Sequence, residues 1–121
     1  MENKDIIAQI DKLTQKTKDK KVAWTITSDQ LARWIQSEGD KTFVTTLQMQ
    51  IRPNYSQNRP VASKAYYLTI QSTNPNEILL QINSRNDDDI KNSLAKLYHS
   101  VMQISEEEKI KKINKLISGI N

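Results

Sequence analysis

The clearest pattern of hydrophobic positions lies in the last third of the chain, where apolar residues recur at alternating steps of four and three. Residues spaced in this way share one face of a helix, and that face has to be buried against another element. Asn86 is a suitable N-cap, and the aspartates at 87–89 suit the positive end of the helix dipole. The pattern therefore predicts a helix from Asp87 to Ile104 whose buried face consists of Ile90, Leu94, Leu97, Val101 and Ile104.

A further helix is predicted to begin at Ser105, because Ser105 and Glu108 have the spacing of a capping box. The chain is then expected to turn at Ile104 and Ser105. Gly119 stands where many helices end. One side of this tail helix is apolar and its lysines lie mostly on the other sides; the apolar residues are Ile110, Ile113, Leu116, Ile117 and Ile120.

The apolar side of the tail helix needs a partner. Burial of one large aliphatic side chain contributes about 1.5–3 kcal/mol, which disfavours leaving several of them in water. We therefore predict that residues 106–121 form a tail helix used in association, either with a protein partner or with a second copy of the chain in a homo-oligomer.

The N-terminal third predicts three shorter elements. A helix is expected over Asp5–Thr17 and a half-buried strand over Val22–Thr27. The segment Ser28–Gly39 is expected to form a short helix, with a serine as its N-cap and a glycine at its end. Trp24 and Trp34 are in phase with apolar neighbours, which favours core positions over a ligand-stacking role. The apolar face of the short helix would consist of Leu31, Trp34 and Ile35.

Alternation of apolar and polar side chains predicts strands in the middle of the chain. The predicted strands are Phe43–Ile51, Tyr66–Ile70 and Ile78–Ile82, and in the last of them the first, third and fifth residues are expected to point inward. The polar segment Pro53–Pro60 interrupts this pattern with a proline at each end, which is typical of an exposed loop.

These elements define a fold class. Consecutive strands joined by loops form an antiparallel sheet, and amphipathic helices cover one face of such a sheet. We predict a single α+β domain over residues 1–121. Its antiparallel meander of about four strands is packed by an N-terminal helix and two C-terminal helices.

Three segments resemble a known group of proteins. They are the strand entry Lys21–Trp24, the strand Tyr66–Ile70 and the helical segment Leu94–Tyr98. Their succession is similar to small uncharacterised proteins of bacteria, phages and mobile elements that share a helix, meander, helix plan over most of the chain. The resemblance implies a fold class and an accessory cellular role, and it carries over no site residues.

Residues that support catalysis are scarce. The absence of cysteine excludes disulfides, thiolate metal sites and cysteine nucleophiles. Two glycines, Gly39 and Gly119, are too few for a glycine-rich phosphate loop. A lone histidine, His99, does not make a usual zinc site, and the aspartates at 87–89 fan out by about 100° each on a helix. We predict a protein that is not an enzyme and has no cofactor or metal site.

Charge supports an alternative hypothesis. The net charge is +4, and the stretch 41–76 contains no acidic residue. A nucleic-acid-binding accessory protein could use this stretch, with basic side chains on phosphates and a tyrosine stacked on a base. The candidate contacts for nucleic acid or another anion are Arg52, Tyr55, Arg59 and Lys64.

The expected cellular location follows from what the sequence lacks. It contains no apolar run of about 18 residues, and its first residues do not form an apolar signal core. We expect a cytoplasmic protein that does not insert into a membrane. The two functional hypotheses are therefore protein association through the C-terminal helices and nucleic-acid binding through the stretch 41–76.

Overall fold

The computed structural model describes residues 2–56, 59–73, 75–85 and 87–120, and the side chains of these except 53–62. Within them the chain forms two helices and one five-stranded sheet. In chain order the elements are α1 (Asn3–Lys18), β1 (Thr25–Ser28), β2 (Leu31–Glu38), β3 (Lys41–Ser56), β4 (Arg59–Thr73), β5 (Asn76–Asn83) and α2 (Asp88–Ser118).

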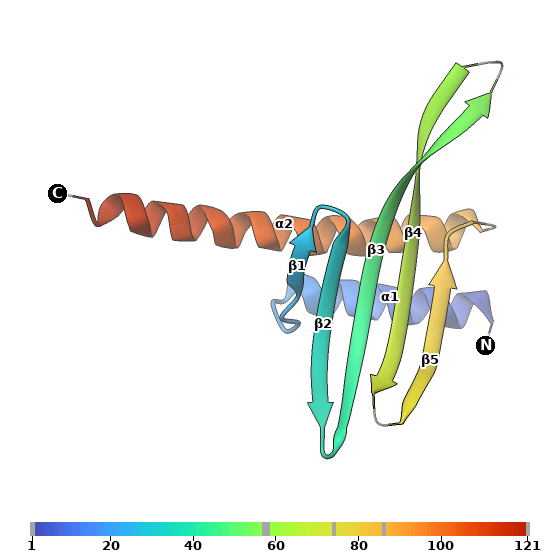
Figure 1. Ribbon diagram of the computed structural model, residues 1–121, viewed down its shortest axis with the longest axis horizontal. Coiled ribbons are helices and arrows are strands. Elements are labelled where there is room, and N and C mark those ends of the chain that lie inside the picture. Colours follow the sequence, from blue (N-terminus) through green and yellow to red (C-terminus); the bar gives the residue numbers. More distant parts are fainter. Residues whose placement is uncertain (1, 57–58, 74, 86, 121) are drawn as a thin grey trace.

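The strands form an antiparallel meander in the order β1-β2-β3-β4-β5, and α1 and α2 lie side by side across one face of it (Figure 1). The predicted α+β class, the antiparallel sheet and the N-terminal helix are confirmed. The number of strands and the two C-terminal helices were predicted wrongly: the sheet has five strands, and one C-terminal helix is present in the described residues.

The core lies between this inner face of the sheet and the two helices. One row of cross-strand neighbours runs from β2 to β5, and its side chains are at most 5% exposed. Ile10 of α1 and Leu94, Leu97 and Val101 of α2 pack in the same cluster. The α2 residues are those that the sequence pattern assigned to a buried face. The row consists of Ala32, Leu47, Leu68 and Ile82.

The segment predicted as a short helix is strand β2. Its residues, from Leu31 to Glu38, all pair with β3, and Gly39 closes the hairpin with a φ of +63°, a conformation that glycine adopts without strain. The apolar spacing of Leu31, Trp34 and Ile35 fits a helix, but in the strand Ile35 points outward and is 64% exposed. A short apolar run fits both periods, and pairing with β3 decided between them.

The predicted turn at Ile104 and Ser105 is absent, because α2 continues through both residues. Glutamates are good helix formers, and no glycine or proline interrupts the helix there. The N-cap is Asp87, whose Oδ1 accepts hydrogen bonds from the backbone N–H groups of Asp89 (2.9 Å) and Ile90 (3.0 Å). Asn86, the predicted cap, lies outside the described residues.

The predicted loop Pro53–Pro60 was also wrong, because β3 runs to Ser56 and β4 starts at Arg59. Beyond Met49 neither β2 nor β5 borders this β3–β4 hairpin, so both of its strands are edge strands there. Proline is tolerated at such edges. In Figure 1 the hairpin extends beyond the two helices.

The register of β5 differs from the expected alternation. Ile70 pairs with Leu80 and Gln71 pairs with Ile78, so one extra residue is present in β5 at this point. This β-bulge removes Ile78 from the inward set, and its side chain is 57% exposed. Leu80 and Ile82 point inward, as the sequence predicts.

Two tyrosines connect the sheet to α2. The rings of Tyr66 and Tyr98 are 5.6 Å apart, and the Tyr98 hydroxyl donates to the backbone oxygen of Asp29 at 2.6 Å. Burial raises the pKa of both phenols; the neighbouring Tyr98 raises that of Tyr66 further, and Asp29 does the same for Tyr98. The pair therefore belongs to the core in its neutral form.

These raised pKa values predict loss of stability at high pH. Above about pH 10 the unfolded chain releases its phenolic protons while the folded chain retains those of Tyr66 and Tyr98, so the free energy of unfolding falls as the pH rises. Urea denaturation between about pH 9 and about pH 11 measures this decline. Tyr98→Phe should make it shallower, and equal slopes for the variant and the wild type would contradict the assignment.

The position of the N-cap generates a second prediction. Asp87→Ala should lower the free energy of unfolding by about 0.5–2 kcal/mol, because two N-terminal N–H groups lose their acceptor. Ser105→Ala should cause no such loss, because Ser105 lies inside α2. Urea denaturation of the two variants is the measurement, and a larger loss for Ser105→Ala would support a helix break at that residue.

Candidate interaction surfaces

The C-terminal part of α2 is not buried by the rest of the fold. Residues 106–120 are all exposed, and in Figure 1 this part of the helix continues past the sheet edge formed by β1. It carries four of the five predicted interface residues, and Ile120 follows two residues after its end; we call the five the tail stripe. Their exposed fractions are 52% for Ile110, 52% for Ile113, 74% for Leu116, 61% for Ile117 and 75% for Ile120.

The tail stripe lies past the part of α2 that packs on the fold. Each residue turns a helix by about 100°, so Leu116 and Ile113 lie about 100° and about 160° around α2 from the buried Leu97. Tyr98 and Met102 pack against the core on this same side of the helix, but residues 106–120 are all exposed because α2 continues past the sheet there (Figure 1). The sheet and α1 of the same chain therefore leave the tail stripe uncovered.

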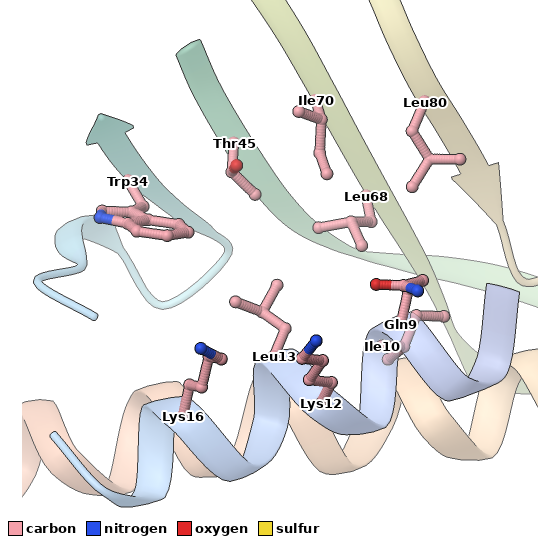
Figure 2. Close-up of a pocket in the computed structure, with 10 residues that line it drawn as sticks. All are labelled: Gln9, Ile10, Lys12, Leu13, Lys16, Trp34, Thr45, Leu68, Ile70 and Leu80. Atoms are coloured by element: carbon pink, nitrogen blue, oxygen red, sulfur yellow. The ribbon is translucent and has the colours of Figure 1, made fainter. Parts of the chain in front are cut away.

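A second apolar surface lies between α1 and the inner face of the sheet. The row of cross-strand neighbours beyond the buried one is Trp34, Thr45, Ile70 and Leu80, and all but the threonine are partly exposed. Together with one flank of α1 this row borders a depression of about 310 Å³, which we call the α1 groove (Figure 2). Its lining residues are Gln9, Ile10, Lys12, Leu13, Lys16, Trp34, Thr45, Leu68, Ile70 and Leu80.

The floor of the α1 groove is apolar and its α1 side is basic. Figure 2 shows Leu13 of α1 pointing toward the sheet, with Lys12 and Lys16 on the same flank of the helix. The ring of Trp34 is 6.3 Å from that of Trp24, whose Nε1 donates to the Thr17 hydroxyl at 3.1 Å. The tryptophans therefore fix one end of the groove.

No pattern in the sequence indicates this groove. Trp34 and Ile70 have the same pattern as core residues. They are partly exposed only because α1 and α2 cover the neighbouring row instead.

The acid-free stretch 41–76 does not gather its candidate contacts on one face. Arg52 donates from Nη2 to the Tyr67 hydroxyl (2.7 Å) and to Gln50 Oε1 (3.1 Å), so its guanidinium is held on the outer face of the sheet. Lys64 pairs with Ile51, the residue before Arg52, and therefore points to the opposite face. The other two predicted contacts, the side chains of Tyr55 and Arg59, lie outside the described part of the structure.

Within the described ranges, no group of three metal-ligating side chains converges. The ring of His99 is exposed and packs edge-on against Tyr98 at 5.4 Å.

Comparison with known proteins adds no relatives: no family model, no curated protein and no solved structure matches the chain. The fold itself defines an α+β protein with an antiparallel sheet that is covered on one face. Among the residues that the structure describes, no helix is both long enough and apolar enough to span a membrane.

Proposed function

We propose that this chain is a non-enzymatic interaction protein that binds another protein chain, a second copy of itself or a different protein, through the tail stripe of α2. The observation that carries the proposal is the concentration of four exposed aliphatic side chains on one side of a helix that projects from the fold, with the exposed Ile120 just after the helix end. Single exposed apolar residues are common on protein surfaces, whereas a contiguous apolar patch marks an interaction site.

Energetics support association. Binding a second chain costs about 4–15 kcal/mol of translational and rotational freedom. Each aliphatic side chain of the tail stripe that becomes buried returns about 1.5–3 kcal/mol. Several such side chains on each chain are of the right magnitude to offset this cost, so affinity depends on how many of them the partner covers.

The proposed setting is the cytoplasm. The chain has no cysteine, as suits a reducing compartment in which disulfides do not form.

Light scattering after size-exclusion chromatography tests the proposal. At high micromolar concentration the wild type should elute as a dimer, and Ile113→Asp should weaken association at least tenfold, because a carboxylate would then have to be buried in the contact. Lys111→Ala changes the net charge by the same amount on the far side of α2 and should have no effect.

Two results together would refute the proposal. The wild type and both variants elute as monomers, and every protein that the wild type recovers from a lysate is also recovered by Ile113→Asp.

Nucleic-acid binding is the second candidate. The observation in its favour is that Arg33, Arg52 and Tyr67 lie on the outer face of the sheet, within or beside the stretch 41–76, which has no acidic residue to repel phosphates. An antiparallel sheet with one open face can present an aromatic side chain to a base and cations to the backbone.

Fluorescence anisotropy with a single-stranded oligonucleotide across salt concentrations tests this candidate. Arg52→Ala should weaken binding and reduce the salt slope by about 0.7, the value for one phosphate contact on a single strand. Arg85→Ala, which removes the same charge from the exposed segment after β5, is the matched control. Absence of binding at low salt, or equal slopes for the two variants, would exclude the candidate.

A further inference from the structure

The tail stripe and the α1 groove are two of the apolar surfaces that lack a partner in the described part of the chain. We infer that the α1 groove of one copy receives the tail stripe of a second copy. This inference rests on the proposed function, since it names the partner and the surface that the tail stripe binds. It is supported by the size of the groove, by its charges and by the direction of α2.

The uncovered part of the inner face is suited to a helix. Successive inward residues of a strand are about 6.8 Å apart, and packed helices lie 8–10 Å apart. A helix placed beside α1 would therefore cover the row of Trp34 and the next row, which runs from Gln36 through Phe43 to Ser72. In Figure 1 the β2–β3 and β4–β5 hairpins extend well past α1 and provide this platform.

The charges of the two surfaces match. The α1 side of the groove carries Lys12 and Lys16. On the opposite side, the ends of the two hairpins carry the exposed residues Glu38, Asp40, Lys41 and Glu77, which are acidic on balance. The groove is therefore basic along one border and mainly acidic along the other.

The tail helix has the complementary arrangement. At about 100° per residue, Glu107 lies on one flank of the tail stripe, with Lys111 farther round on that side, and Lys112 lies on the other flank. Lys109 lies within the stripe. Glu106 precedes the stripe on the same side of the helix. A tail in the groove can therefore place Lys112 along the hairpin acids and Glu107 along Lys12 and Lys16. Each exposed ion pair contributes little, so the charges select orientation while apolar burial provides affinity.

The occupant has to come from another copy. From Asp88 to Ser118 α2 is a single helix, so its C-terminal part cannot fold back onto the groove of its own chain. Each copy offers one tail and one groove. Reciprocal exchange between two copies then gives a closed dimer with two equivalent contacts.

A mixing experiment separates this arrangement from direct pairing of two tails. Leu13→Asp blocks the groove and leaves the tail intact, whereas Ile113→Asp blocks the tail and leaves the groove intact. Each variant alone should be monomeric by light scattering. An equimolar mixture should contain a heterodimer, because one tail and one groove remain compatible, and this single contact should bind more weakly than the pair in the wild type.

Leu13→Asp could lose dimerisation simply because it unfolds, so a second variant changes only exposed residues of the groove. Lys12 and Lys16 are exposed, so the double variant Lys12→Glu/Lys16→Glu should retain the circular dichroism of the wild type while its dimer dissociates at least tenfold more readily. Lys4→Glu/Lys96→Glu makes the same charge change at two exposed positions outside the groove and should dimerise like the wild type.

The outcomes distinguish the two proposals. The inference is overturned, with the proposed function intact, if Ile113→Asp is monomeric while Lys12→Glu/Lys16→Glu dimerises like the wild type, or if the two monomeric variants do not associate when mixed. A wild type that remains monomeric overturns the exchange of tails between copies and leaves only a different protein as the partner of the tail stripe.

Discussion

The structure depends on the packing of two helices against one face of a five-stranded sheet. A row of four aliphatic side chains crosses the sheet from Ala32 to Ile82, and Ile10, Leu94 and Leu97 pack against it. Burial of this apolar area is the main favourable term in the stability of a domain of this size. The same contact orients α2 and so determines where its C-terminal part points.

Unequal lengths of the packed elements generate the exposed surfaces. The helices cover the upper inner face, while the β2–β3 and β4–β5 hairpins extend past α1 (Figure 1). At its other end α2 extends past the sheet. The C-terminal part of α2 therefore has no sheet beneath it, and the ends of the two hairpins have no helix above them. Both exposed surfaces are apolar, and both result from this difference in length. The proposed exchange between two copies would remove the mismatch in each.

Buried faces with a strong hydrophobic period were predicted correctly, whereas residues that resemble helix or strand ends led to wrong predictions. The buried face of α2 and the inward residues of β4 were evident from the sequence, because burial imposes the period of the element on the side chains. Ser105 and Glu108 have the spacing of a capping box, and Pro53 and Pro60 resemble loop residues, yet α2 and the β3–β4 hairpin continue through them. A capping-box spacing or a proline ends a helix or strand only where the surrounding structure does not hold the chain in that helix or strand.

The tail stripe could be located from the sequence alone, since five aliphatic residues on one side of a lysine-rich helix stand out without any knowledge of the fold. The sequence also determined the α+β class and the absence of cysteine and glycine-loop chemistry. Only the tertiary structure decided that Leu31–Glu38 is a strand, that α2 is unbroken and that Trp34 borders a groove. Strand pairing and the covering of one row rather than the next are contacts between residues distant in the chain, and local spacing carries no information about them.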